Sequence, residues 1–259
     1  MNSVAKAFSV LTAFQPTTPV MSVSEVAAAT NLDRGTAYRL LVTLLDLGYL
    51  VNVPSKRFRL SLKCLELGFN ALSSHDLWEH AKPLLEECVP RVADAASLGT
   101  LEGSDILYLQ RVDNGLAGRN LDLRPGRRVK AYASALGHAI LAYLPESTQI
   151  QTLESSPRIK LSERTLTELP DLLARCAEVR QHGFAVSDGE NAYGLRTVAA
   201  AVFNSTHVPV AAVSLTVEAA RMTIDELVET GAPHVLRIAD RLSKALADSV
   251  DSIPLTAHH

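Results

Sequence analysis

The chain has 259 residues, a formal net charge of −3 and a hydrophobic fraction of 47%, which fits one large domain or two modest ones. No apolar run approaches the ~20 residues that span a bilayer, and the N-terminus lacks the pattern of a secretory signal. The three cysteines, Cys64, Cys88 and Cys176, form no CxxC pair, so neither a zinc site nor a disulfide framework is predicted. We therefore expect a cytoplasmic protein with no cofactor, no metal and no membrane partner.

The charge is distributed unevenly along the chain. Residues 1–62 hold six basic and three acidic side chains, a net charge of +3, so the remainder carries −6. A basic head on an acidic body is typical of a nucleic-acid-binding head joined to a sensor or oligomerisation body. Ordinary fluctuation would explain the same numbers, so the sequence pattern has to decide.

The first 30 residues predict two helices. The first has one apolar face, formed by Val4, Ala7, Phe8, Leu11 and Phe14, and residues 16–19 end it. Ser22-Val23-Ser24-Glu25 is a capping box that opens a second helix running to about Thr30.

A tight turn and a third helix follow. Asn31 is the best non-glycine residue for a positive φ angle, and Asp33 can cap a helix over residues 34–47. Gly48 is a suitable C-terminal stop. The buried stripe of this helix is predicted to be Ala37, Leu40, Leu41, Leu44 and Leu45. Two helices at this spacing have helix-turn-helix geometry.

The next segment predicts a basic β-hairpin, or wing. Residues 49–53 and 57–60 alternate as strands around a turn at residues 54–56. Lys56, Arg57 and Arg59 suit phosphate contact. A structural three-helix unit and a solvated hairpin edge are the alternatives. The candidate DNA contacts are Ser22, Arg34, Gly35, Thr36, Tyr38, Arg39, Thr43, Lys56, Arg57 and Arg59.

Beyond residue 62 the pattern changes to strands and helices in an α+β order. Helical stretches are predicted at 62–72, 77–95, 134–144, 166–182 and 223–249, with Pro83 tolerated only in a first turn or a kink. Strands are predicted at 97–101, 106–112, 118–123, 184–187, 196–203 and 209–216. Hairpins flanked by helices indicate an α+β domain around an antiparallel sheet.

At this point the sequence resembles the IclR family of bacterial transcription regulators. The motifs of the head are Ser22-Val23-Ser24-Glu25-Val26-Ala27, Thr36-Ala37-Tyr38-Arg39-Leu40-Leu41 and Leu47-Gly48-Tyr49-Leu50. Those of the body are Leu65-Glu66-Leu67-Gly68, residues 132–139, Asp188-Gly189-Glu190 and residues 194–199. Asn31 departs from the glycine usual in the family, and Gly35 lies in the first turn of the recognition helix.

The resemblance implies a domain organisation. A winged helix-turn-helix would occupy residues 1–62, a linker helix 63–76, and a GAF-like effector and oligomerisation domain 77–250, with a disordered tail at 251–259. Within the family the chain is similar to regulators of aromatic-acid catabolism, the protocatechuate and hydroxybenzoate group.

The resemblance also implies an effector site. Family members hold small ligands at the positions of Ala135, Leu136, Asp188, Leu195, Thr197, Ser214 and Thr216. Strand alternation separately places Thr197 on one face of its strand and Ser214 with Thr216 on one face of theirs. A helix N-terminus after Ser134, with Arg127, Arg128 and Lys130 upstream, favours a carboxylate effector, aromatic or dicarboxylic. The alternatives are that Thr and Ser simply suit strands and that the cations line a solvated loop.

Two other function classes compete. An enzyme acting at a pocket of Asp188, Thr197 and Ser214 is disfavoured, because the sequence contains no GxSxG, HExxH, P-loop or GxGxxG motif. Asp188 and Glu190 would share a strand face without a nucleophile, and His138 is expected to be packed or surface-facing. A non-DNA interaction or sensor module is disfavoured by the basic wing.

We therefore expect a regulator that is not an enzyme and that binds double-stranded DNA at a pseudo-palindromic operator as a homodimer. The resemblance adds a homotetramer built as a dimer of dimers, and RNA polymerase as a candidate partner.

Overall fold

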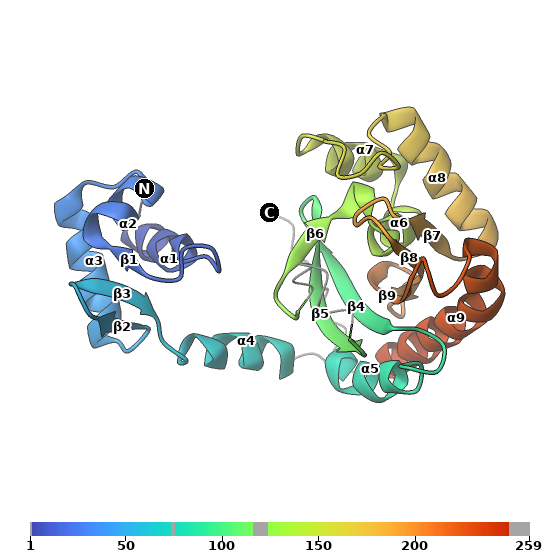
Figure 1. Cartoon of the computed structure of the whole chain (residues 1–259), viewed down its shortest axis with the longest axis horizontal. Helices are drawn as coiled ribbons and strands as arrows, with labels where there is room; N and C mark the ends of the chain where they lie inside the picture. Colours follow the sequence, from blue (N-terminus) through green and yellow to red (C-terminus); the bar gives the residue numbers. More distant parts are fainter. Residues whose placement is uncertain (1, 74–75, 116–123, 249–259) are drawn as a thin grey trace. The chain divides into compact units, whose positions relative to one another are not determined.

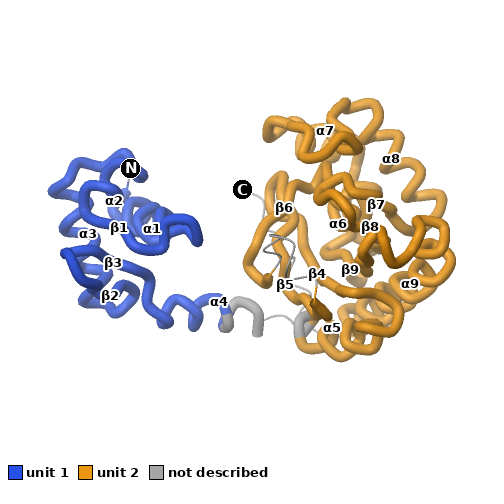
Figure 2. The backbone as a smooth tube through the Cα atoms, in the orientation of Figure 1, with its two compact units in different colours: residues 1–74 blue, residues 75–259 orange. Residues whose placement is uncertain are grey.

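The computed structural model describes residues 2–73, 76–115 and 124–248. The chain divides into two compact units, residues 1–74 and 75–259 (Figure 2). No helix of the described part is both long and apolar enough to cross a membrane. The predicted strand at 118–123 and the predicted tail at 251–259 lie outside the described residues.

The first unit has the winged helix-turn-helix order that the sequence predicts (Figure 1). Its elements are α1 Ser3–Ala13, β1 Met21–Ser22, α2 Val23–Thr30, α3 Arg34–Asp46, β2 Leu50–Val53, β3 Arg57–Leu60 and α4 Cys64–Ser73. The three strands form an antiparallel sheet in the order β1-β3-β2. Val26, Leu41 and Phe58 bring α2, α3 and the wing into one apolar core.

The apolar face predicted for α1 is partly wrong. Val10, which lies outside that face, is fully buried together with Phe14, whereas Val4 and Phe8 are 59% and 58% exposed. The apolar stripe of α1 is wider than the part that α2 and α3 can cover, so its N-terminal half stays on the surface of the unit.

The second unit is an α+β domain on a six-stranded antiparallel sheet of order β6-β5-β4-β9-β8-β7. Its strands are β4 Ala95–Glu102, β5 Asp105–Asp113, β6 Arg128–Lys130, β7 Ala185–Asp188, β8 Leu195–Phe203 and β9 Pro209–Glu218. Its helices are α5 Asp76–Glu86, η2 Ala131–Ala133, α6 Ala135–Leu141, α7 Glu146–Glu154, α8 Leu169–His182 and α9 Ile224–Asp248. Helices α5 and α9 pack on one face of the sheet, and α6 with α8 packs on the other (Figure 1).

Two details differ from the expectation. The helix predicted over 77–95 ends at Glu86, and residue 95 already opens β4. Pro83 lies in the last turn of α5 and not in a first turn. Because proline has no N–H, it cannot make the helical hydrogen bond to the Glu79 carbonyl one turn earlier. Helix α7 was not predicted, because Ile150 and Leu153 are its only large apolar residues.

Helix α6 is held in close contact with the 3₁₀ turn η2. A Cβ atom added at Gly137 would lie 2.5 Å from Ala131 Cα and 2.6 Å from its carbonyl carbon. Only glycine fits here, because neither partner is a flexible side chain.

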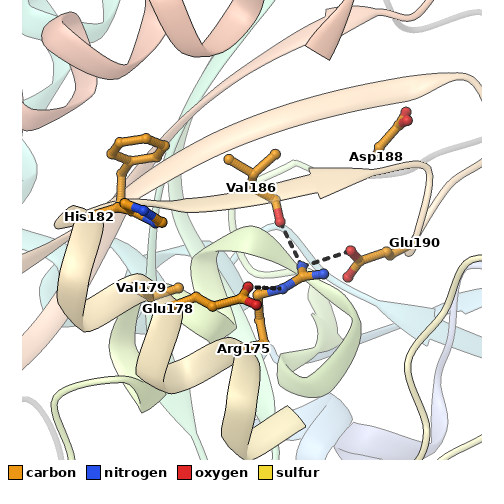
Figure 3. Close-up of a pocket in the computed structure, with 8 residues that line it drawn as sticks. Arg175, Glu178, Val179, His182, Val186, Asp188 and Glu190 are labelled. Carbon is orange, nitrogen blue, oxygen red and sulfur yellow. Dashed lines mark hydrogen bonds and ion pairs between the residues drawn. The ribbon is translucent and has the colours of Figure 1, made fainter. Parts of the chain in front are cut away.

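His138 of α6 belongs to a cluster of ionisable side chains with Glu190 and Arg175. His138 is fully buried, and its Nε2 lies 2.7 Å from the Tyr132 carbonyl oxygen. Since a carbonyl can only accept, Nε2 carries the proton, and Nδ1 faces Glu190 Oε2 at 3.9 Å. Arg175 donates to Glu190 Oε1 at 2.9 Å and to the Val186 carbonyl oxygen at 3.0 Å (Figure 3). Burial, reinforced by the Arg175 charge, lowers the pKa of His138 to about 4, whereas burial raises the pKa of Glu190.

The Gly137 packing yields a stability prediction. We expect Gly137→Ala to lower the free energy of unfolding by about 2 kcal/mol or more through overpacking, although alanine favours a helix by up to ~1 kcal/mol. The matched control is Gly68→Ala in α4, where an added Cβ meets no heavy atom within 4 Å, and this variant should lose no stability. Urea unfolding followed by circular dichroism measures both; equal stability of the two variants would contradict the close packing.

The buried histidine predicts an acid-dependent loss of stability. Its folded pKa of about 4 lies below the unfolded value of 6.5, so the unfolded chain binds the proton first as the pH falls. The stability that neutral His138 contributes is present above pH 6.5 and is lost towards pH 4, by up to ~3 kcal/mol. His138→Gln removes this titration, so the difference in unfolding free energy between wild type and variant should shrink from pH 7 to pH 4.5. A pH-independent difference would show that His138 does not titrate in this way.

Candidate functional site

The helix pair is held by the caps that the sequence predicts. In the capping box of α2, Glu25 Oε2 accepts the Ser22 N–H at 2.6 Å, and Ser22 Oγ accepts the Glu25 N–H at 3.4 Å. Asn31 ends α2 in the left-handed region, with φ 53° and ψ 37°. Asp33 Oδ1 accepts the Thr36 N–H at 2.8 Å and so begins α3. These hydrogen bonds lower the pKa values of Glu25 and Asp33, so both are carboxylates at neutral pH.

The capped helix α3 turns one face inward and one outward. Ala37, Leu41 and Leu44 are buried, and Leu40 and Leu45 are half-buried. The candidate contacts on the opposite side are exposed, except for half-buried Thr36: Arg34, Gly35, Thr36, Tyr38, Arg39 and Thr43. Cations, hydroxyls and a phenol on one exposed helix face can read base edges and phosphates in a major groove.

Gly35 has a local structural reason as well. A Cβ atom there would lie 3.3 Å from Asp33 Oδ1, the atom that caps α3. The glycine thus leaves room for the cap, a reason that the sequence pattern did not reveal.

The three cations of the wing differ in their exposure and in their contacts. Ser55 and Lys56 both have left-handed φ angles, 67° and 57°, and Lys56 and Arg59 are exposed. Arg57 is half-buried, and its Nη2 donates to the Val20 carbonyl oxygen at 2.6 Å and pairs with Glu25 Oε2 at 3.3 Å. Lys56 and Arg59 therefore face solvent, whereas Arg57 binds within its own unit.

In the second unit, four residues of the predicted effector site lie together on the α6 face of the sheet. Thr197 pairs directly with Thr216, and the two hydroxyl oxygens are 3.0 Å apart. Ser214 pairs with Ala199 on one side and Ser97 on the other. Leu195 shares the face of Thr197, two residues away, and is buried.

Ala135 and Leu136 of α6 lie against this face of the sheet. Both are almost fully buried in α6, which packs against β8 and β9. A Cβ atom at Gly99 would lie 3.3 Å from Leu136 Cδ1, so the helix contacts the sheet closely. The structure thus brings six of the seven predicted residues to one side of the sheet.

Asp188 lies apart from them. Ser187, and not Asp188, opposes Thr197 in the sheet. The Asp188 carboxylate pairs with Arg196 Nε at 3.0 Å and with Arg164. The expectation that Asp188 and Glu190 share a strand face is wrong, because β7 ends at Asp188 and the chain then turns through Gly189 at φ 74°. An enzyme pocket of Asp188, Thr197 and Ser214 is therefore not assembled.

The predicted anion-binding features are occupied within the protein. Ser134 Oγ accepts the Gly137 N–H at 3.1 Å and caps the short helix α6. Arg128 pairs with Glu102 at 3.5 Å, and Lys130 pairs with Asp105 at 2.8 Å.

A cation that the sequence analysis missed lies beside the hydroxyls instead. The Arg111 side chain is only 9% exposed; its Nη1 donates to Ser97 Oγ at 3.0 Å, and its Nη2 pairs with Asp113 at 3.1 Å. Ser97 pairs with both Arg111 and Ser214, so Arg111 shares the polar face of the sheet. Strand alternation alone would not have found it, because Ile106 and Tyr108 lie on the α6 face and only the register shift opposite Leu98 and Gly99 brings Arg111 to the same side.

A separate pocket of about 230 Å³ opens between α8 and β7 (Figure 3). Arg175, His182, Phe184 and Val186 contribute to its lining. None of the hydroxyl residues of the sheet face lines it. Within the described ranges no group of three or more His, Cys, Asp or Glu side chains could hold a metal ion.

Comparison with known families agrees with this architecture. Residues 3–54 match the IclR helix-turn-helix domain, and residues 69–244 match the family described as bacterial transcriptional regulator IclR C-terminal. Both families consist of transcription regulators and not of enzymes.

Individual relatives span nearly the whole chain. The Pca regulon regulatory protein of Pseudomonas putida is 30% identical over 91% of this chain and 81% of its own length. The regulator XynR of Escherichia coli is 29% identical over 88% of this chain and 90% of its own length.

Solved structures share the fold. The IclR protein of Thermotoga maritima superposes with a TM-score of 0.74 at 26% identity, covering 95% of this chain and 99% of that one. An IclR homologue from Microbacterium hydrocarbonoxydans, complexed with 4-hydroxybenzoate, gives a TM-score of 0.80 at 24% identity, covering 95% and 99%. The chain belongs to the IclR family and is a DNA-binding transcription regulator with a C-terminal effector domain.

Proposed function

We propose that this regulator controls a catabolic operon for an aromatic or other organic acid and responds to that acid as its effector. The observation that carries the proposal is the polar sheet face beneath α6, where Ser214 and Thr216 are buried and Thr197, partly buried, lies within hydrogen-bond distance of Thr216. A few oriented polar groups in an apolar setting are typical of a small-molecule site.

Arg111 adds a nearly buried polar group to the same face. Its Nη1 donates to Ser97, and its Nε and Nη2 both bind Asp113 Oδ2, at 3.2 and 3.1 Å. The acidic nature of the proposed effector is therefore inferred from the relatives. The relative that regulates the Pca regulon and the homologue complexed with 4-hydroxybenzoate point towards aromatic acids. The proposed effector contacts are Ala135, Leu136, Leu195, Thr197, Ser214 and Thr216; Asp188, the seventh candidate, lies at the end of β7 and pairs with Arg196.

For DNA, the proposal assigns reading of the bases to the exposed face of α3 and phosphate contact to the wing. Arg39 lies at the centre of that face, where its Nη2 also donates to Thr36 Oγ1 at 3.0 Å. Lys56 and Arg59 are exposed on the wing. The further contacts are Ser22, Arg34, Gly35, Thr36, Tyr38 and Thr43.

A homodimer on a pseudo-palindromic operator completes the proposal, because one recognition helix reads only a half-site. Apolar side chains exposed on the first unit supply surface for a second copy, namely Val4 and Phe8 in α1 and Leu62 and Leu65 near the start of α4. The family resemblance favours a further step to a dimer of dimers and contact with RNA polymerase.

The DNA contact is tested by Arg39→Ala. We expect its affinity for a duplex selected from a random pool by the wild-type protein to fall by roughly 10- to 200-fold, since a specific arginine–base contact contributes ~1–3 kcal/mol. Arg91→Ala, an exposed arginine of the second unit, is the charge-matched control and should bind as wild type does. Unchanged affinity of Arg39→Ala would contradict the proposed recognition face, and the absence of any selected duplex would favour a non-DNA interaction module.

The effector is tested by thermal shift with matched pairs of acids and amides. 4-Hydroxybenzoate, protocatechuate or succinate at 100 times its Kd should stabilise the protein by ~2.7 kcal/mol, whereas 4-hydroxybenzamide should not. Thr197→Val should reduce the shift, because it removes a hydroxyl and keeps the shape of the side chain. Stabilisation by neutral or cationic compounds alone would refute an acidic effector.

A further inference from the structure

We infer that Arg57 is a positioning residue that locks the wing onto the start of α2, and that it does not itself bind a DNA phosphate. It opens β3, directly after the turn residue Lys56. Sequence position alone groups it with Lys56 and Arg59 as a phosphate contact. The contacts of its guanidinium group distinguish Arg57 from Lys56 and Arg59, which face solvent.

The Arg57 guanidinium makes three contacts, two with the Glu25 carboxylate and one with the Val20 carbonyl oxygen. Arg57 Nη2 lies 2.6 Å from the Val20 carbonyl oxygen, 3.3 Å from Glu25 Oε2 and 3.4 Å from Glu25 Oε1. The same Glu25 oxygen accepts the Ser22 N–H at 2.6 Å. Arg57 Nε is buried and has no hydrogen-bond partner among the described residues, while the side chain as a whole is 40% exposed. One carboxylate thus joins the helix cap to the wing.

The wing needs such a lock because its backbone attachment is small. Strand β3 meets β1 through two residue pairs only, Met21 with Phe58 and Ser22 with Arg57. A two-stranded hairpin has little stability of its own. Beside the backbone pair of Ser22 and Arg57, the Arg57 side chain adds one contact with Val20 and another with Glu25. It therefore resists rotation of the wing about its short edge contact.

The charges agree with this assignment. Hydrogen bonds from Ser22, followed by the charge of Arg57, lower the pKa of Glu25, so the pair is ionised at neutral pH. The Glu25 carboxylate already offsets the charge of Arg57, so a phosphate would gain less from this cation than from an unpaired one. Lys56 and Arg59 take part in no ion pair among the described residues, so their charges are available to the DNA backbone.

The two roles of Arg57 predict opposite effects of removing its partner. Glu25→Gln keeps a capping-box acceptor for the Ser22 N–H and removes only the ion pair. If Arg57 positions the wing, Glu25→Gln releases the wing and weakens binding. If Arg57 contacts phosphate, Glu25→Gln frees the cation, removes a negative charge and strengthens binding.

The experiment is fluorescence anisotropy of the full-length protein over a salt series. It uses two probes, a duplex selected from a random pool by the wild-type protein and an unrelated duplex of equal length. The variants are Arg57→Ala, Glu25→Gln and their double mutant, with Lys56→Ala as the phosphate-contact reference. Circular dichroism establishes that each variant is folded at the assay temperature.

We expect Glu25→Gln and Arg57→Ala each to weaken binding to the selected duplex by about fivefold or more, and the double mutant to bind no worse than Arg57→Ala. The slope of log affinity against log salt should change little in Arg57→Ala but fall by about 1 in Lys56→Ala. Tighter binding by Glu25→Gln to both duplexes, together with a slope in Arg57→Ala that falls as in Lys56→Ala, would overturn the inference.

Discussion

The effector unit depends on strand alternation across one six-stranded antiparallel sheet. On one face, Leu98, Val213 and Leu215 pack against α5 and α9 as a continuous apolar layer. On the other face, Gly99 lets α6 approach closely, and the hydroxyl residues Thr197, Ser214 and Thr216 form a polar strip. Because side chains alternate along the strands, apart from the register shifts at Leu98/Gly99 and Val202/Phe203, a one-residue slip would exchange the two faces. The same register therefore sets the core and the proposed effector site together.

In the DNA-binding unit, single residues serve two elements at once. Glu25 completes the cap of α2 and receives Arg57 from the wing, and Phe58 of the same strand enters the core shared with α2 and α3. Such shared contacts let a unit of about seventy residues present a helix and a hairpin in a fixed relation. A rigid relation matters here because reading a groove and contacting its phosphates must occur in one docking position.

Local chemistry explains which features were predictable from the sequence. The Ser22 capping box, the left-handed turn at Asn31, the cap at Asp33 and the wing strands are short-range patterns, and all are confirmed. The errors concern tertiary contacts. Nothing local indicates that Val10 rather than Val4 meets the core, that Arg57 reaches Glu25 across 32 residues, or that Arg111 lies beside Ser97 on a polar sheet face. Asp188 and Glu190 do not share a strand face, because β7 ends at Asp188 and Gly189 turns the chain there.

The pairing of charges also changes what the net charge of the head means. The ion pair between Arg57 and Glu25 cancels one positive and one negative charge, and Asp33 is held at the N-terminus of α3 as a cap. Arg34 and Arg39 on α3, with Lys56 and Arg59 on the wing, are left as exposed cations on the two elements assigned to DNA. The attraction to DNA therefore depends on where the unpaired cations lie, and a net charge of +3 counted along the sequence does not describe it. The salt dependence of binding is therefore set by those exposed cations, and the half-exposed pair of Arg57 and Glu25 contributes to the geometry in which they act.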